Sequence, residues 1–255
     1  MTTTLAGKKG LVIGIANEHS IAWGCARAFH AQGAELGTTW INDKARLHVE
    51  PLAKEIGATL CMPLDVEADD QMATLFAAVS RQWGRLDFLL HAVAYAPRQD
   101  LHGRMVDASR DGFLRAMDIS CHSFVRLARL AEPLMDTGGS LLTLSYLGAD
   151  EAIADYGLMG PVKSALESSV RYLAAELGPQ GIRVNAVSPG PVATRAASGI
   201  AHFDTLLADA ARRAPMRRLV TIDDVGALCA FLASDAATAM TGGTLFVDAG
   251  YNILN

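Results

Sequence analysis

Two tyrosines and a lysine in the middle of the sequence have the types and spacing needed to handle a proton. Tyr146 follows the apolar run 141–144, and Lys163 comes seven positions after Tyr156. At about 3.6 residues per turn, positions seven apart lie roughly 20° from alignment, so Tyr156 and Lys163 share one face of a helix that extends back to Tyr156. A phenol is a weak acid with a pKa near 10, and a neighbouring ammonium makes it a better donor. The pattern predicts a Tyr–Lys pair that acts together.

An apolar stripe on the same stretch places this pair at the margin of the helix, next to strand ends. The stripe consists of Val162, Leu166, Val170, Leu173 and Leu177. It lies beside the face that carries Lys163, so the helix packs on a sheet while the polar pair faces the strand ends. A cofactor would lie there. Ser145, directly before Tyr146, is a further polar side chain at this position.

Short apolar runs alternate with longer amphipathic stretches along the whole chain. The expected strands are 10–13, 35–40, 59–62, 86–93, 140–145, 183–187 and 244–247. The expected helices are 20–32, 44–56, 68–82, 111–135, a stretch through 163–177, and 222–234. Strands that read as continuous apolar runs suit a parallel sheet covered on both faces. We expect a single α/β domain over residues 1–255, with a doubly wound, Rossmann-type sheet.

In such a fold, binding residues follow the carboxyl ends of the strands. Gly14 can make the tight turn after the first strand, and Ser20 can cap the next helix, whose amino end would hold a pyrophosphate. Asp65 ends the third strand, where a carboxylate could accept an adenine amino hydrogen. The segment 91–97 after the fourth strand is rich in small residues that let a ribose approach. These residues predict a dinucleotide site.

The tip of the second strand bears on the choice of dinucleotide. It contains no acidic residue to hold a ribose 2′-hydroxyl and no arginine to hold a 2′-phosphate. We expect NADH, and Lys44 and Arg46 lie close enough to keep NADPH as an alternative.

Composition excludes several classes of function. The 255 residues include 22 Lys plus Arg and 27 Asp plus Glu, a formal charge of −5, so the chain has no basic surface for nucleic acid. The seven histidines show no paired ligand spacing, so no metal site is expected. The four cysteines form no C-x-x-C pair, and no apolar run is long enough for a membrane helix. We expect a cytoplasmic protein with inert thiols.

The assembled motifs resemble the enoyl-acyl-carrier-protein reductases, a divergent branch of the short-chain dehydrogenase/reductases. The resemblance covers residues 6–247, and its most specific parts are Leu-Ser-Tyr-Leu-Gly at 144–148 and the pair Tyr156 and Lys163 with six residues between them. Pro189-Gly-Pro191 followed by Ala-Ala-Ser-Gly-Ile at 196–200 also matches. The resemblance implies NADH-dependent reduction of the trans-2 double bond of enoyl thioesters in fatty acid biosynthesis, by a homotetramer.

The resemblance also implies individual roles. Tyr156 would hydrogen-bond the thioester oxygen, Lys163 would anchor the nicotinamide ribose, and Tyr146 would orient the thioester; these three are the catalytic residues. Substrate would contact Ala96, Tyr146 and Tyr156. The dinucleotide would contact Gly14, Ser20, Ile21, Ile41, Asp65, Val66, Val93, Lys163, Val192, Ala193, Thr194, Arg195 and Ala196. The residues 193–213, part of the long stretch 188–215 that shows no clear pattern, would form a mobile lid.

Two departures from the family pattern keep alternatives open. Pro161 lies between Tyr156 and Lys163 and fits only if the regular helix begins within a residue or two of Gly160. The lid lacks the basic residues that would meet an acidic carrier protein, although Arg195, Arg212, Arg213, Arg217 and Arg218 are candidates to replace them. The substrate is therefore an enoyl chain on acyl carrier protein or on coenzyme A. A carbonyl or hydroxyl dehydrogenase that uses Ser145, and a non-catalytic dinucleotide sensor, are the other interpretations.

Overall fold

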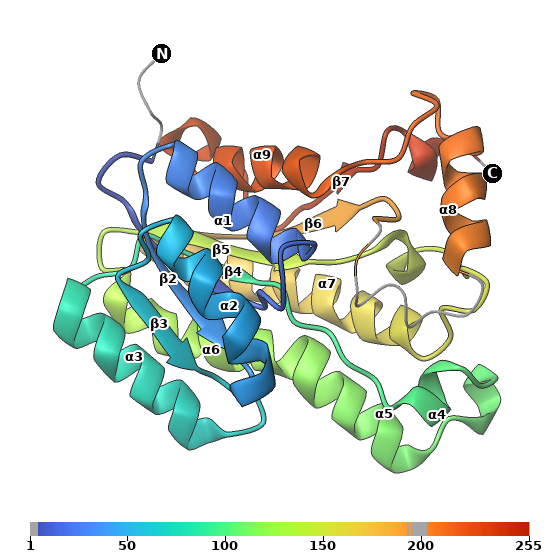
Figure 1. Ribbon diagram of the computed structural model, residues 1–255, viewed down its shortest axis with the longest axis horizontal. Helices are drawn as coiled ribbons and strands as arrows, with labels where there is room; N and C mark the ends of the chain where they lie inside the picture. Colours follow the sequence, from blue (N-terminus) through green and yellow to red (C-terminus); the bar gives the residue numbers. More distant parts are fainter. Residues whose placement is uncertain (1–4, 193, 195–202, 255) are drawn as a thin grey trace.

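A seven-stranded parallel sheet runs through the part of the chain that the computed structural model describes, residues 5–192, 194 and 203–254 (Figure 1). The strand order is β3-β2-β1-β4-β5-β6-β7. The strands are β1 (Lys9–Ile13), β2 (Glu35–Trp40), β3 (Leu60–Pro63), β4 (Phe88–His91), β5 (Gly139–Leu144), β6 (Ile182–Pro189) and β7 (Thr244–Val247). This order confirms the predicted doubly wound fold, and its switch point lies between β1 and β4.

Helices cover both faces of the sheet, which explains why the central strands are apolar throughout. The helices are α1 (Ile21–Ala31), α2 (Asp43–Glu55), α3 (Asp69–Trp83), α4 (Arg98–Leu101), α5 (Arg110–Met117), α6 (Ser123–Ala131), α7 (Met159–Leu177), α8 (Phe203–Arg213) and α9 (Ile222–Ala233). One apolar cluster joins the sheet to α1, α2 and α9, and a second joins it to α3, α6 and α7. Figure 1 shows α8 at the opposite end of the molecule from α3.

Helices α1 and α9 pack with almost no space between their backbones. A Cβ atom placed on Gly24 would lie 2.3 Å from the carbonyl oxygen of Ile222, and one placed on Gly226 would lie 2.5 Å from that of Gly24. The two glycines therefore bring the helices together, and α1 carries the first turn that faces the predicted cofactor site.

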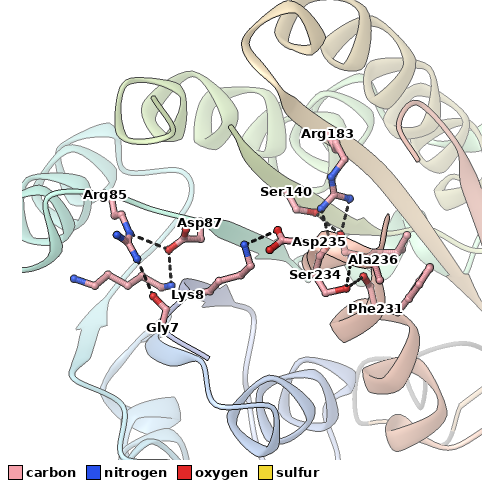
Figure 2. A network of polar contacts seen from close by, with 12 residues as sticks. Gly7, Lys8, Arg85, Asp87, Ser140, Arg183, Phe231, Ser234, Asp235 and Ala236 are labelled. Carbon is pink, nitrogen blue, oxygen red and sulfur yellow. Dashed lines mark hydrogen bonds and ion pairs between the residues drawn. The ribbon is translucent and has the colours of Figure 1, made fainter. Parts of the chain in front are cut away.

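A network of polar contacts ties segments together on the side of the sheet where its strands begin (Figure 2). Lys8 forms an ion pair with Asp235 at 2.8 Å, and Asp87 accepts hydrogen bonds from the backbone of Lys9 and from Arg85. Arg183 donates to the carbonyl oxygens of Leu232 and Ser234, just where α9 ends. These contacts lie at the edge opposite to the carboxyl ends, so they stabilise the fold and leave the other edge open.

The helix expected over 111–135 is present as one continuous helical stretch, but it is not uniform. It consists of α5, a π-helical turn over Asp118–His122, α6, and a short 3₁₀ turn over Glu132–Leu134. Two serines bond at the π turn: the hydroxyl of Ser123 donates to Ile119 O at 2.6 Å, while that of Ser120 donates to Tyr95 O and accepts from Tyr95 N. The π turn holds the loop that follows β4.

The stretch 188–215 is also more regular than the sequence predicts. Strand β6 extends to Pro189, and α8 occupies 203–213. The alanine-rich composition of 206–214 is typical of helix, but the Gly and Pro residues on either side obscure it. Of the predicted lid, residues 193 and 195–202 lie outside the described residues.

The close contact of α1 and α9 predicts that Gly24→Ala destabilises the protein. The added methyl group would overlap the Ile222 carbonyl, so we expect the free energy of unfolding to fall by about 1–3 kcal/mol in chemical denaturation. Gly178→Ala is the control, because that glycine has ordinary right-handed helical dihedrals and open space around it. Equal stability of the two variants would contradict this account of the packing.

Candidate active site

A cavity of about 490 Å³ opens at the carboxyl ends of the strands, on both sides of the switch point. It is lined by the loop after β1, the tip of β2, the segment after β3, the segment after β4, and by Ser145 and Lys163. Nine of the predicted cofactor residues line it: Gly14, Ser20, Ile21, Ile41, Asp65, Val66, Val93, Lys163 and Thr194. Strand order thus gathers residues that are far apart in the sequence.

The floor of the cavity depends on Gly14, where β1 ends. Its φ of 112° lies in the region that favours glycine, and an added Cβ atom would be 2.2 Å from the carbonyl oxygen of Ala92. The backbone of Ala92 is in turn held to β1, because its N–H donates to Ile13 O at 2.9 Å. The sequence predicts a tight turn at Gly14; the structure adds that the loops after β1 and β4 can approach this closely only with glycine here.

The sequence predicts that Ser20 caps α1. Ser20 does precede this helix, but its side chain forms no cap. Its hydroxyl oxygen accepts hydrogen bonds from the N–H groups of Ala16 and Asn17, and its hydroxyl donates to the carbonyl oxygen of Asn17. Ser20 therefore folds the loop 14–20 back on itself, and no side-chain cap occupies the amino end of α1. Ile21 and Ala22, in the first turn, line the cavity and present the positive end of the helix dipole to an anion.

The tip of β2 is already occupied by contacts within the chain. Asn42 accepts a hydrogen bond from Ala45 N and caps α2, while Arg46 pairs with Glu50 at 2.7 Å and lies over the Trp40 ring. Ile41 lines the cavity without a polar group. No arginine is therefore directed at a 2′-phosphate from this strand tip within the described residues.

The rim beside Asp65 includes residues that the sequence analysis missed. Asp65 accepts a hydrogen bond from Glu67 N, which turns the chain after β3; it does not cap α3, whose cap position is Ala68. Arg115 binds both carboxylate oxygens of Glu67, at 2.9 and 2.8 Å, and lies over the Tyr95 ring. One guanidinium thus joins three segments at the rim, a contact that no sequence spacing predicts.

Lys163 is buried, with only 5% of its surface exposed. Its ammonium donates to the carbonyl oxygen of Leu144 at 2.7 Å and borders the cavity. Desolvation lowers the pKa of Lys163 to about 8, and the nearby Cys121 and Glu167 oppose that change. The lysine therefore titrates close to neutral pH.

Tyr156 and Lys163 do not share a helix. Helix α7 begins at Met159, and Tyr156 lies in the preceding turn, where Asp155 and Gly157 have positive φ. Pro161 falls in the first turn of α7, so the condition set by the sequence is met. The expected cause of a stronger phenol donor is also wrong, because burial, Tyr146 and Glu167 raise the pKa of Tyr156. Tyr156 stays protonated and can donate a hydrogen bond.

Tyr146 packs against Tyr156, with ring centroids 4.8 Å apart. Neither ring lines the cavity described above. Gly148 makes room for both, since a Cβ there would lie 2.4 Å from the Tyr156 ring and 3.3 Å from that of Tyr146. The Tyr146 hydroxyl is buried and has no hydrogen-bond partner among the described residues. Burial raises its pKa too, so both phenols are neutral donors.

Glu167 is a buried acidic residue that the sequence analysis did not identify. It lies one helical turn after Lys163 and accepts a hydrogen bond from the hydroxyl of Ser145. Burial raises the pKa of Glu167, while hydrogen bonds from Ser145 and Thr244 lower it. The signal was present, because positions four apart on a helix are neighbours, and Lys163 and Glu167 have that spacing.

His91, at the end of β4, is fully buried between two hydroxyl groups. One ring nitrogen lies 2.8 Å from Thr143 Oγ1 and the other 2.9 Å from Ser123 Oγ. Burial, with the charge of Lys163, lowers the pKa of His91 to about 3. The imidazole is therefore neutral at physiological pH and adds no positive charge beside Lys163.

The remaining predicted residues lie elsewhere. Val192 is buried and does not line the cavity, and Ala96 packs at the edge of the apolar cluster that includes Tyr156. Ala193, Arg195 and Ala196 lie outside the described residues. Among the described residues, no group of three His, Cys, Asp or Glu side chains could hold a metal ion.

The cavity fits a dinucleotide in three respects. Gly14 permits a close backbone approach, the uncapped amino end of α1 suits a pyrophosphate, and Lys163 offers a cation at the other end. The lining is mostly apolar, as expected for rings that are bound by packing.

Comparison with known proteins agrees with the family resemblance of the sequence. A family model described as enoyl-(acyl carrier protein) reductase matches residues 14–252. An enoyl-[acyl-carrier-protein] reductase [NADH] of Nostoc sp. is 48% identical over 253 residues, which cover 98% of each chain.

Two solved structures are also similar. The enoyl reductase of Anaplasma phagocytophilum, in complex with NAD, has a TM-score of 0.95 and 47% identity, and the alignment covers 99% of this chain and 97% of that one. The Bacillus cereus enoyl-acyl carrier protein reductase, with NADP⁺ and an indole naphthyridinone, has a TM-score of 0.97 and 42% identity, and the alignment covers 99% of each chain.

The buried His91 predicts a specific sensitivity to acid. Its pKa in the folded protein, about 3, is below the ordinary value of 6.5, so the unfolded chain alone takes up a proton between these values. The free energy of unfolding should fall as the pH drops from 6.5, by up to about 1.4 kcal/mol per pH unit. His91→Gln removes the titrating group, so its denaturation midpoints between pH 7 and 5 should depend less on pH. His48→Gln, at an exposed histidine, should keep the wild-type slope; an unchanged slope in His91→Gln would assign the acid sensitivity to another group.

Proposed function

Because the chain belongs to the enoyl-(acyl carrier protein) reductase family, we propose that it reduces the trans-2 double bond of enoyl thioesters with NADH, as a step of fatty acid biosynthesis. The observation that carries this proposal is Lys163 at the cavity, seven positions after Tyr156, whose ring packs on that of Tyr146. The protein is an NADH-dependent oxidoreductase, like the relatives that it matches over their full length.

The cofactor is held by residues that line the cavity. The backbone at Gly14 and the amino end of α1 receive the pyrophosphate, Asp65 and Val66 lie at the adenine, and Lys163 donates to the ribose hydroxyls next to the nicotinamide. Thr194 also lines the cavity and is proposed to contact the nicotinamide end of the cofactor. NADH is favoured over NADPH because Arg46 is engaged by Glu50 and Trp40.

NADH bound in this cavity would supply a hydride to the β-carbon of the enoyl chain, and a proton from solvent would complete the reduction at the α-carbon. Negative charge then develops on the thioester oxygen, and the neutral phenol of Tyr156 donates a hydrogen bond to it. Tyr146, whose buried hydroxyl lacks a partner within the described residues, orients the same thioester. Ala96 adds an apolar contact at the edge of this site.

The structure disfavours two other functions. A carbonyl dehydrogenase would need the Ser145 hydroxyl as a donor to its substrate, but that hydroxyl donates to Glu167. Pro161 suggested a non-catalytic sensor, because a proline in the interior of the helix would kink it and misplace Lys163. Pro161 lies in the first turn of α7, and Lys163 still reaches the cavity.

We propose that the acyl chain is presented on acyl carrier protein, the carrier named for the relatives that the chain matches. Coenzyme A is the second candidate, because the arginines near α8 are engaged within the chain. Arg212 and Arg213 bind Asp209, and Arg218 binds Asp224 at 2.7 Å. They contribute less to docking of an acidic protein than isolated cations would.

Further proposals concern the organisation of the protein. We propose that residues 1–255 act as one domain in which 193–213 covers the acyl chain. A homotetramer is supported by the exposed aromatic residues Phe231 and Phe246 in the apolar C-terminal part. A cytoplasmic location is supported by the four free cysteines. Within the described residues, no helix is long and apolar enough to cross a bilayer.

The proposal is tested by following NADH oxidation with one trans-2-enoyl chain presented on acyl carrier protein and on coenzyme A. We expect turnover with both and a kcat/KM at least about tenfold higher on the carrier protein, with NADPH less effective than NADH. A hydroxyl substrate with NAD⁺ serves as the control for the dehydrogenase interpretation. Turnover of that substrate, with none of the enoyl thioesters, would overturn the proposed function.

Tyr156→Phe tests the role of the phenol. The variant keeps the ring and its packing on Tyr146 but loses the hydrogen bond to the thioester oxygen, so kcat should fall by about 10²–10³-fold. The Kd of NADH, measured by fluorescence, should change little. Tyr172→Phe removes an exposed hydroxyl from α7 and should leave both values at wild type. Full turnover in Tyr156→Phe would exclude the role.

A further inference from the structure

Two buried groups of opposite charge lie one helical turn apart on α7, and only one of them borders the cavity. Lys163 and Glu167 are each 5% exposed, and only Lys163 lines the cavity. A buried carboxyl group that contacts neither solvent nor ligand is expensive to desolvate. Such a group needs an explanation in terms of its partners.

The contacts of Glu167 connect it with the residues that hold Lys163. Its carboxyl group accepts the hydroxyl hydrogen of Ser145, the residue next to Leu144. Leu144 is the residue whose carbonyl oxygen accepts the Lys163 ammonium. Ser145 N is bonded to Val187 O at 2.8 Å. The Glu167 carboxyl group is therefore tied to the end of β5, and Thr244 at the start of β7 acts to lower its pKa.

We propose that Glu167 is a positioning residue: its carboxylate keeps the Lys163 ammonium protonated inside the fold and fixes the end of β5 where that ammonium binds. The proposal rests on the proposed function in one respect, since it takes Lys163 as the group that holds the cofactor ribose. Glu167 itself touches neither cofactor nor substrate.

The other groups around the pair do not replace Glu167. From β4, His91 is neutral. From the π turn, Cys121 opposes the fall of the Lys163 pKa as Glu167 does, but burial raises the pKa of this thiol and so disfavours its charged form. Tyr146 and Tyr156 are neutral phenols. Asp150 and Arg171 act on Glu167, Asp150 by raising its pKa and Arg171 by lowering it. Glu167 is thus the carboxylate beside Lys163 in the described part of the chain, and its removal should make the lysine lose its proton at lower pH.

The test is the pH dependence of NADH binding to the full-length protein, measured by fluorescence from pH 6.5 to 9. In the wild type, affinity should fall as the pH rises through about 8, where Lys163 loses its proton. Glu167→Gln keeps an acceptor for Ser145 and removes only the charge, so the loss should begin about one pH unit lower. Binding by the variant should then be about fivefold weaker at pH 8 and less than about 1.5-fold weaker at pH 6.5.

Three further variants make the result specific. Glu176→Gln changes the same charge at an exposed position of α7 and should overlay the wild type. Thr244→Val removes one donor to Glu167 and disfavours its ionised form, so it should cause a smaller shift in the same direction; it carries the test if Glu167→Gln fails to fold. In a Lys163→Arg background the effect of Glu167→Gln on the pH profile should vanish, because arginine does not titrate in this range.

The possible outcomes are distinct. Coincident pH profiles for the wild type, Glu167→Gln and Thr244→Val would overturn the proposal. Uniformly weaker binding by Glu167→Gln at every pH would also overturn it, because that result indicates structural damage alone. A wild-type affinity that is flat from pH 6.5 to 9 would overturn it together with the ribose-binding role of Lys163, whereas the enoyl reduction assay would still test the proposed function separately.

Discussion

The structure of the site depends on one costly requirement, a lysine ammonium held away from water. An isolated charge in a protein interior either finds compensating groups or loses its proton. Lys163 has a carbonyl oxygen at the end of β5 and a carboxyl group one turn further along α7. His91, the other basic side chain nearby, is held neutral by burial. Much of the polar arrangement behind the cavity is explained by this single charge.

The parallel sheet supplies the geometry that this requirement needs. Strands β4, β5 and β6 end side by side, so the Leu144 carbonyl, the Ser145 hydroxyl and the segment after β4 arrive at one edge. Helix α7 begins near that edge, and Lys163 in its second turn reaches the Leu144 carbonyl oxygen. The polar network at the opposite edge joins β1, β4 and α9 through Lys9, Asp87 and Arg183 without approaching the cavity (Figure 2). Stabilising contacts and the binding site therefore occupy different ends of the same strands.

The sequence predicted most of the sheet and the cavity lining, because strand periodicity and residues after strand ends are local signals. The predicted range of β2, 35–40, and the predicted tight turn at Gly14 were both correct. Several errors come from local side-chain hydrogen bonds that periodicity does not encode. A π turn with Ser123 bonded to Ile119 lies inside a helix that reads as uniform, and Ser20 bonds to its loop where a cap was expected. The Tyr156 turn depends on Asp155 and Gly157 at positive φ, which no periodicity reveals. Arg115 was missed because its carboxylate partner lies 48 positions away. Glu167 was missed although its spacing of four from Lys163 is a local signal, because its hydrogen-bond partner Ser145 lies 22 positions away.

At Gly14 the floor of the cavity has no room for a side chain, because a hypothetical Cβ atom would lie 2.2 Å from the Ala92 carbonyl oxygen. Amino acids offer no step between a hydrogen atom and a methyl group, so this distance cannot be tuned gradually by substitution. Evolution or laboratory selection can adjust cofactor affinity at many positions around the cavity, in small increments of size and charge. At Gly14 only glycine fits, so a different cofactor geometry would require substitutions at other residues around the cavity.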